Sequence, residues 1–371
     1  MRLGIPKETR PGETRVAIVP DSLSKLARQG LEVVVERGAG EASGFPDAQY
    51  EEKGGKPADA GEVFAAPLVA AIHAPAPERL ASGTVLVCTA DPLGNPKGVA
   101  DLAAAGVTCF ALELMPRISR AQSMDVQSSM ANVAGYKAAL LAAARLPRLF
   151  PLMMTAAGTV RPARVFVLGA GVAGLQAIAT ARRLGAVVEA YDIRPDTKEE
   201  VESLGAKFVQ FDLGAEDVQD EGGYARELTA EQKAKQARLM AEVIQSADAV
   251  ITTAQVPGRK APLLVPADVV RGMKPGSVIV DMAADSGGNC ELSRPGEEVL
   301  EGGVLILGPS NLPGSVAHSS SQLFANNVVN FLSHLVKDGA VAIDLEDEVL
   351  AGPLVCHKGE VTNERVREAL S

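Results

Sequence analysis

The stretch Arg164–Pro195, RVFVLGAGVAGLQAIATARRLGAVVEAYDIRP, decides the fold. An apolar, strand-like run leads directly into Gly169, Gly171 and Gly174, and the glycines open a helical pattern. The first glycine of such a turn permits its sharp bend. The second lets a phosphate approach the backbone, and the third lets the helix pack against the strand. Because a second strand follows and ends at Asp192, the stretch predicts a βαβ unit that binds a dinucleotide rather than a merely glycine-rich turn.

The residues around this turn also predict which dinucleotide binds. The N-terminus of the helix, with Val172 and Ala173 in its first turn, offers free N–H groups and a positive dipole end to the phosphates. A carboxylate at Asp192 accepts hydrogen bonds from the adenosine ribose and repels a 2′-phosphate, which favours NAD over NADP. Arg194 is the counter-argument, because an arginine can receive that phosphate; we give Asp192 more weight. Ile193 between them is included among the predicted cofactor contacts.

Strand-like runs alternate with helical patterns along most of the 371 residues, which indicates βαβ units and parallel sheets. The apolar content of 47% with only 4% aromatic residues suits such layers. Two long helical patterns, at about 124–146 and 319–339, bracket the second set of strands. We therefore predict an α/β chain of two Rossmann-like, doubly wound, parallel-sheet domains, joined by these helices with a cleft between them. The predicted domains are 1–128 with 320–371, and 129–319.

Composition excludes several classes of function. The formal charge of −10 argues against nucleic acid as a partner. The charged start MRLGIPKETR lacks the apolar segment of a signal peptide, and no apolar run reaches the roughly 18–20 residues of a membrane helix. The four cysteines are scattered without a CxxC pair, which predicts buried, reduced thiols rather than a disulfide or a metal site.

Three later segments hold further candidates. ITTAQVPGRKAP ends a strand, and Ala254 and Gln255 within it are predicted to lie against the cofactor. DMAADSGGN ends the next strand, where Asp281 and Asp285 either face the cleft or simply cap and turn the chain. The acidic segment AEDVQDEGGYARELT, at 215–229, is either a solvated insertion or a mobile lid, with Gly223 and Tyr224 closing over a ligand.

MPRISRAQSMD, at 115–125, follows the apolar run VTCFALEL and gathers polar side chains. Arg117, Gln122 and Asp125 lie within nine positions, and Ser128 follows shortly after. A polar cluster at the end of a strand is either an ordinary wet loop or the floor of an active site. The residues of the loop alone leave both readings open.

The segment GIPKETRPGETRVAIVP and the whole order of parts resemble one family across essentially the full chain. It contains alanine dehydrogenase and the NAD-binding α subunit of proton-translocating nicotinamide nucleotide transhydrogenase. An amino-acid dehydrogenase needs a cation for the substrate carboxylate and groups that move protons. Arg15 stands at the family's arginine position and Asp285 matches a catalytic aspartate. However, Ala71 takes the place of the lysine, TVLVCTADPL lacks the histidine, and His73 is assigned to a polar loop position. NAD-dependent alanine dehydrogenase is therefore kept as the alternative.

A transhydrogenase moves hydride directly between two nicotinamide rings, so it needs positioning groups rather than a base. PRISRAQSMD is similar to the loop that grips the nicotinamide end of NAD(H) in that enzyme. The resemblance implies that Gln122 contacts the nicotinamide ribose, and that Arg117, Asp125 and Ser128 orient the carboxamide. Tyr224 resembles the tyrosine of the family's mobile loop. We therefore predict an active-site loop, within which Arg120 is interpreted as a solvated loop arginine.

The chain carries a single GxGxxG turn, so it is expected to bind one dinucleotide. The resemblance implies that NADP(H) lies on a partner subunit attached to membrane-embedded subunits that carry protons. It also implies that this chain is a free-standing homodimeric subunit, cytoplasmic and peripheral to the inner membrane through its partners, without direct membrane insertion or a metal. A non-catalytic NAD-binding sensor is the third alternative, and it leaves the polar loop and the tyrosine unexplained.

Overall fold

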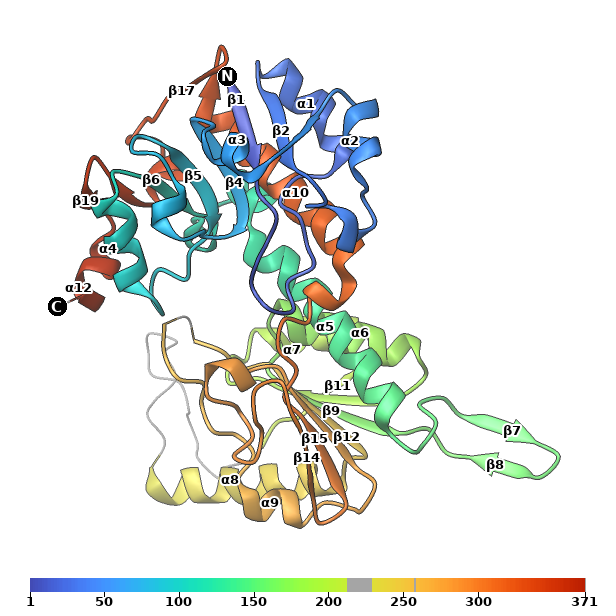
Figure 1. Ribbon diagram of the computed structural model, residues 1–371. Coiled ribbons are helices and arrows are strands. Elements are labelled where there is room, and N and C mark those ends of the chain that lie inside the picture. The colour runs from blue at the N-terminus through green and yellow to red at the C-terminus, as the bar shows by residue number, and fades with distance from the viewer. Residues whose placement is uncertain (212–228, 257, 371) are drawn as a thin grey trace. The chain divides into compact units, whose positions relative to one another are not determined.

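The structure is a computed structural model that describes residues 1–211, 229–256 and 258–370. It divides into two compact units, each described here by itself: unit 1 is Met1–Ala131 with Pro313–Ser371, and unit 2 is Asn132–Leu312 (Figure 1). The first boundary between the two units along the chain, after Ala131, falls within helix α5 (Val126–Arg145). The division into domains 1–128 with 320–371 and 129–319 stays a prediction.

Unit 2 is built on a seven-stranded sheet in which the first strand along the chain lies in the interior. Its order is β11 (Lys207–Phe208), β10 (Val187–Tyr191), β9 (Arg164–Leu168), β12 (Ala249–Thr252), β13 (Val278–Asp281), β15 (Val304–Leu307) and β14 (Glu298–Glu301). All neighbours pair in parallel except β14, which is antiparallel to β15. Its helices besides α5 are α6 (Val172–Arg183), α7 (Thr197–Ser203), α8 (Ala230–Ser246) and α9 (Ala267–Arg271). The predicted doubly wound sheet is confirmed.

The apolar strand β9 explains why this sheet has helices on both faces. Val165 and Val167 are buried in one hydrophobic cluster, whereas Phe166 and Leu168 are buried in a second one. Successive side chains of a strand point to opposite faces, so a continuous apolar run needs cover on both sides. The strand is therefore fixed at the centre of the unit, and its carboxyl end fixes the position of the glycine turn.

The glycine turn is packed so tightly that side chains are excluded at two points. Gly169 has a φ of +98°, and a Cβ placed on Gly174 would lie 1.9 Å from the Gly169 carbonyl oxygen. A Cβ on Gly135 of α5 would lie 2.0 Å from the carbonyl oxygen of Ala173. Glycine is therefore required where helix α6 meets the strand and where α5 crosses the turn.

Unit 1 is built on an eight-stranded sheet with a similar central pattern. Its order is β19 (Glu360–Val361), β18 (Leu354–His357), β6 (Thr108–Ala111), β5 (Val85–Thr89), β4 (Leu68–His73), β1 (Arg2–Ile5), β2 (Glu32–Glu36) and β3 (Lys56–Ala58). Strands β1 to β6 pair in parallel, whereas β18 is antiparallel to β6 and to β19. The C-terminal segment therefore completes the sheet that the N-terminal segment begins.

Short helices and one long helix surround this sheet. They are α1 (Leu23–Arg28), α2 (Asp47–Glu52), α3 (Ala60–Phe64), α4 (Pro96–Ala104), α10 (Ala317–Leu335), α11 (Glu348–Ala351) and α12 (Glu364–Leu370). Helix α10 buries Phe324, Val328 and Phe331 in the same cluster as Leu3 and Ile5 of β1. A strand and a helix more than 300 positions apart thus share one core.

The remaining elements are two small ribbons and single turns of 3₁₀ helix. β16 (Val336–Lys337) pairs with β17 (Ala340–Val341), and β7 (Met153–Thr155) pairs with β8 (Gly158–Val160). The 3₁₀ turns are η1 (Pro20–Ser22), η2 (Glu41–Ser43), η3 (Pro77–Arg79), η4 (Leu112–Leu114), η5 (Ser119–Met124), η6 (Ala284–Ser286) and η7 (Gly314–Val316). Figure 1 shows the β7–β8 hairpin extending away from the sheet of unit 2. The sequence patterns did not predict this hairpin.

Glu113, in the turn η4 after β6, is an enclosed carboxyl group. Its Oε1 accepts hydrogen bonds from Ala90 N at 2.8 Å and Asp91 N at 2.5 Å, whereas its buried Oε2 has no partner among the described residues. Burial disfavours the charged form, outweighs the backbone hydrogen bonds and raises the pKa of Glu113 to about 7. The carboxyl group therefore carries an electrostatic cost when it is ionised.

Glu113→Gln is expected to relieve this cost in a pH-dependent way. The folded protein holds the Glu113 proton more tightly than the unfolded chain, so its stability falls as pH rises from about 4.5 through 7. Glutamine does not titrate, so the variant's advantage in free energy of unfolding should be larger at pH 8 than at pH 5, by about 1–3 kcal/mol. Urea unfolding at both pH values measures it, with exposed Glu51→Gln as the control. An equal difference at both pH values would contradict the expectation.

Candidate functional site

The nucleotide turn of unit 2 is open where a phosphate would lie. Gly171 is the N-cap of α6, and a Cβ on it would meet only the Arg194 Nη2 atom, at 3.9 Å. The first helical bond runs from Leu175 N to Gly171 O at 2.8 Å. The N–H groups of 172–174, which include the predicted Val172 and Ala173, therefore stand at the free N-terminus of a 12-residue helix. This end of α6 suits an anionic ligand.

Asp192, at the end of β10, is held in a network of donors. Its Oδ2 accepts a hydrogen bond from Ala170 N at 2.7 Å, and its Oδ1 accepts one from Arg194 N at 2.9 Å. The Arg194 guanidinium lies alongside, with Nε and Nη2 each 3.0 Å from a carboxylate oxygen. Burial opposes ionisation, but Arg194 and the backbone N–H groups outweigh it and hold the pKa of Asp192 below its usual value. Ile193 beside it is 83% exposed.

The exit of β12 forms the other wall of the turn. Thr253 Oγ1 donates to the Gly169 carbonyl oxygen at 3.0 Å. Buried Asn289 binds both backbone groups of Ala254, at 3.0 Å to its N and 2.9 Å to its O. Gln255 Nε2 donates to the Met282 carbonyl oxygen at 2.9 Å. Asn289 was missed from the sequence; the only signal was an amide inside the glycine-rich segment DSGGN.

Asp281 and Asp285, left open by the sequence, have different surroundings. Asp281 is fully buried and accepts hydrogen bonds from Thr252 Oγ1 at 2.9 Å, Cys290 N at 3.0 Å and Ser293 Oγ at 2.6 Å. It therefore caps and turns the chain. Asp285 is exposed and accepts a hydrogen bond from Ser310 Oγ at 2.7 Å. Gly223 and Tyr224, which the sequence placed in the site, lie outside the described residues.

In unit 1 the polar loop after β6 presents two unpaired side chains. Arg117 and Gln122 are exposed, and neither side chain has a hydrogen-bond partner among the described residues. Asp125 and Ser128 are brought together instead: Ser128 N donates to Asp125 Oδ1 at 2.9 Å, and Ser128 Oγ donates to Oδ2 at 2.7 Å. This pair begins helix α5, so Asp125 has a capping role whatever else it does.

Arg120 is exposed, as the sequence predicts, but it also forms an ion pair. Its Nη2 lies 2.6 Å from Asp347 Oδ1, and the aspartate side chain is only 20% exposed. The sequence did not reveal this ion pair, because the partner lies 227 positions away. The loop is therefore tied to the C-terminal segment of unit 1.

A buried ionic cluster lies at the carboxyl ends of β1 and β4. The guanidinium of Arg15 binds Glu13 through both Nε, at 2.8 Å, and Nη2, at 2.6 Å. His73 Nε2 lies 2.8 Å from Glu13 Oε2. Burial opposes ionisation of Glu13, but Arg15 and His73 outweigh it and hold its pKa well below the usual value. His73 is the last residue of β4 and is partly buried, so its assignment to a polar loop position was wrong.

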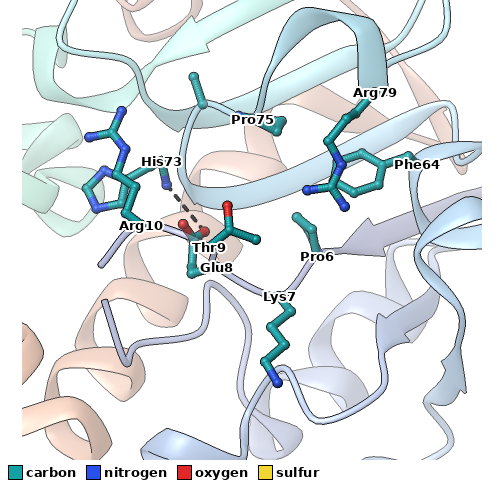
Figure 2. A pocket seen from close by; sticks show the side chains of 10 residues that line it. Pro6, Lys7, Glu8, Thr9, Arg10, Phe64, His73, Pro75 and Arg79 are labelled. Carbon is teal, nitrogen blue, oxygen red and sulfur yellow. Dashed lines mark hydrogen bonds between the residues drawn. The ribbon is translucent and has the colours of Figure 1, made fainter. Parts of the chain in front are cut away.

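Beside this cluster lies a small pocket lined by residues 6–10, Phe64, 73–75 and Arg79 (Figure 2). Glu8 Oε1 accepts hydrogen bonds there from Ile72 N at 2.7 Å and His73 N at 3.3 Å. Burial raises the pKa of Glu8 to about 7. Figure 2 shows Glu8 and Thr9 near the middle, whereas the Lys7 side chain points away. The pocket thus centres on one carboxyl group.

Two further features concern metal and membrane. No three His, Cys, Asp or Glu side chains lie close enough to hold a metal ion within the residues that the structure describes. In the same residues, the helices are all too short or too polar to span a membrane. All four cysteines are free and buried.

Two family models cover most of the chain. The alanine dehydrogenase/PNT N-terminal domain matches residues 4–134, and the alanine dehydrogenase/PNT C-terminal domain matches residues 138–364. The chain is 46% identical over 376 residues to an NAD(P) transhydrogenase subunit alpha chain of Rhodospirillum rubrum, covering 98% of each. It is 30% identical over 382 residues to alanine dehydrogenase of Bacillus subtilis, covering 100% of this chain and 95% of that one.

Solved structures agree with these matches. The crystal structure of transhydrogenase from Sinorhizobium meliloti is 44% identical, has a TM-score of 0.86 and covers 98% of this chain and 99% of its own. An L-alanine dehydrogenase structure is 25% identical with a TM-score of 0.84, and covers 100% and 99%. Because both halves match and the similarity runs along the whole length, the chain belongs to the alanine dehydrogenase/PNT family.

Proposed function

We propose that this chain is the NAD(H)-binding subunit of a proton-translocating nicotinamide nucleotide transhydrogenase. One observation of the structure carries the proposal: Arg117, just before the turn η5, and Gln122, within it, are exposed and have no side-chain partner among the described residues, whereas Ala121 and Met124 of the turn are buried. Such a turn can hold and aim a ligand without moving a proton. The similarity to the Rhodospirillum rubrum subunit over 98% of both chains supports the same assignment.

The proposed reaction needs no base on this chain. Bound NADH supplies a hydride from its C4, and the hydride passes to C4 of NADP⁺ on a partner subunit, so one nicotinamide is oxidised as the other is reduced. Gln122 positions the nicotinamide ribose, and Arg117, Asp125 and Ser128 orient the carboxamide. Holding the two nicotinamide rings in contact accelerates hydride transfer through orientation rather than through acid–base chemistry.

The nucleotide turn fits the other end of the cofactor. The open space at Gly171 and the free N–H groups of α6 suit the pyrophosphate, and Asp192 suits the ribose. Ile193, Ala254 and Gln255 flank these groups. Arg194 is bound to Asp192 rather than free to receive a 2′-phosphate. These contacts support NAD(H) on this chain and NADP(H) on the partner.

Asp192→Asn tests the choice of cofactor. Loss of the carboxylate removes the repulsion of a 2′-phosphate and releases Arg194, so the preference for NADH over NADPH should fall about tenfold. Titrations of the chain with each reduced cofactor, followed by nicotinamide fluorescence, measure both dissociation constants. Glu189→Gln on the same strand, whose carboxylate binds Arg164 and Lys207, is the matched control. Equal binding of NADH and NADPH by the unsubstituted chain would refute the assignment.

Hydride transfer itself is tested with a partner. The chain, mixed with the NADP(H)-binding subunit, is expected to reduce an NAD analogue at the expense of NADPH. Gln122→Asn shortens the side chain by one methylene and should slow this transfer by at least about tenfold while the NADH dissociation constant stays within about twofold. Ser119→Ala in the same turn is the control. No transfer by the unsubstituted chain would defeat the proposed function.

The surroundings of Arg15 disfavour the alternative function, alanine dehydrogenase. The guanidinium that would receive a substrate carboxylate is 6% exposed and already bound twice by Glu13. Glu8, with a pKa of about 7, suits proton transfer near neutral pH. Lys7, Arg10 and Arg79 also line this pocket, but the guanidinium at the family's arginine position is already paired with Glu13. A parallel assay with alanine and NAD is expected to show no turnover.

The ion pair between Glu13 and Arg15 can be tested for its contribution to stability. Glu13→Ala leaves a buried guanidinium without its carboxylate, so the free energy of unfolding should fall by about 3–5 kcal/mol. The double variant Glu13→Ala with Arg15→Met should lose less, because no unpaired charge remains. Urea unfolding of the two variants checks the difference. A small loss in the single variant would show that Arg15 is available for a ligand.

We propose that the chain works as a homodimer beside NADP(H)-binding and membrane-embedded subunits, in the cytoplasm and peripheral to the inner membrane through those partners. The exposed apolar residues at the β7–β8 hairpin support this dimer, because they offer a surface for a second copy of the chain. Leu152 is 55% exposed, Met154 73% and Val160 46%, and the ribbon has unpaired edges. Sedimentation at the 38.5 kDa mass of one chain would contradict the dimer.

A further inference from the structure

The position of the Gln122 side chain is set by its backbone. It is exposed and makes no hydrogen bond within the described part of the chain. It stands on the 3₁₀ turn η5, Ser119–Met124, between Ala121, which is 0% exposed, and Met124, which is 2% exposed. A displacement of this turn would therefore displace the amide directly.

Two polar anchors hold the turn on either side of Gln122. On one side, Arg120 Nη2 lies 2.6 Å from Asp347 Oδ1. On the other, the Ser123 carbonyl oxygen accepts hydrogen bonds from Asn327 Nδ2 at 2.8 Å and Asn330 Nδ2 at 3.1 Å. The anchors come from helix α10 and from the segment before α11, both more than 200 positions along the chain.

Each anchor is itself held in place. Asp347 is the N-cap of α11 and accepts a hydrogen bond from Val349 N at 3.0 Å. Asn327 is 5% exposed on a helix face that also buries Phe324, Val328 and Phe331. Its Oδ1 is buried without a hydrogen-bond partner among the described residues. A buried amide with an unpaired oxygen is unfavourable, so its place in an apolar face is best explained by the bond that its NH₂ group makes to the turn.

We propose that Asn327 and Arg120 are positioning residues for hydride transfer, which fix the turn that aims Gln122. This inference rests on the proposed function. Asn327 acts through the Ser123 carbonyl group, and Arg120 acts through Asp347. Neither residue contacts the nucleotide. Their loss lets the turn shift, so the ring alignment suffers while the nucleotide site of unit 2 keeps its contacts.

Asn327→Leu and Arg120→Ala are the test variants. With the NADP(H)-binding partner saturating, single-turnover hydride transfer should slow about tenfold in each, whereas NADH should bind within about twofold of the unsubstituted chain. Arg120→Lys should recover part of the rate because it restores the charge opposite Asp347. Asp347→Asn, which keeps an oxygen for the Val349 N–H group, should resemble Arg120→Ala. Hydrogen exchange of the amides at 117–125 should quicken in the slow variants, measured on the chain alone.

Two controls match the test variants. Arg271→Ala removes an exposed arginine bound to Glu301 at 2.7 Å in unit 2, and Ser333→Ala removes a hydroxyl that bonds only within α10, to Asn330 O. Both should transfer hydride at the unsubstituted rate. If the test variants match these controls in rate and exchange, the inference is overturned. If NADH affinity falls in parallel with the rate, the residues are merely structural and the inference is again overturned. No transfer by the unsubstituted chain overturns the proposed function and the inference together.

Discussion

Parallel strands end together at one edge of a sheet, and the backbone N–H groups of the loops that start there have no strand partner. In this chain the oxygens of carboxylate side chains accept hydrogen bonds from such N–H groups. Glu8 binds two N–H groups at the end of β4, Glu113 binds two at the end of β5, and Asp192 binds those of Ala170 and Arg194. The loops at these sheet edges are therefore held by acidic side chains, of which only Asp192 was singled out from the sequence, as a cofactor contact.

The electrostatics of these carboxylates divides them into two groups. Glu8 and Glu113 have backbone donors, and burial raises the pKa of each to about 7. Glu13 and Asp192 each have a guanidinium as well, and their pKa values are lowered. A raised pKa in a pocket is also a sign of acid–base catalysis, but the same shift arises when a structural carboxyl is enclosed. The guanidinium of Arg15, the nearest counterpart of a substrate-binding cation in the family, is already paired with Glu13, which favours the structural reading of Glu8.

Much of the fold could be predicted from the sequence because its signals are local. The apolar strand before Gly169, the glycine turn and the acid at Asp192 are contiguous, and the parallel α/β sheets they predict are confirmed. The antiparallel strands β14 and β18 were not predicted from the sequence. The β7–β8 hairpin was missed because its exposed apolar residues resemble, in the sequence, the residues of a buried core.

The site could be predicted only as a set of residue types. Asp125 and Ser128 are neighbours by spacing, but the role of Arg120 depends on Asp347, and that of His73 depends on Glu13. No local pattern reveals a partner 60 or 227 positions away. Asn289 and Asn327 were missed for the same reason, because a buried amide is recognised by the backbone groups that it binds. The roles given to Arg117 and Gln122 stay predictions.

The two units share a strand order, 3-2-1-4-5, over the first five strands of each sheet, but differ at the point where that order reverses. In unit 2 the chain leaves β9 through glycines, which leave room for a ligand phosphate and a free helix N-terminus. In unit 1 the chain leaves β1 through residues 6–15, and the corresponding place is filled by Glu8 and by the ion pair of Glu13 with Arg15. One topology thus yields an open glycine turn in unit 2 and, in unit 1, a small pocket whose carboxyl group is already bonded to the backbone. In the loop after β6 of unit 1, the Ser123 carbonyl group beside Gln122 accepts hydrogen bonds from Asn327 and Asn330 of helix α10.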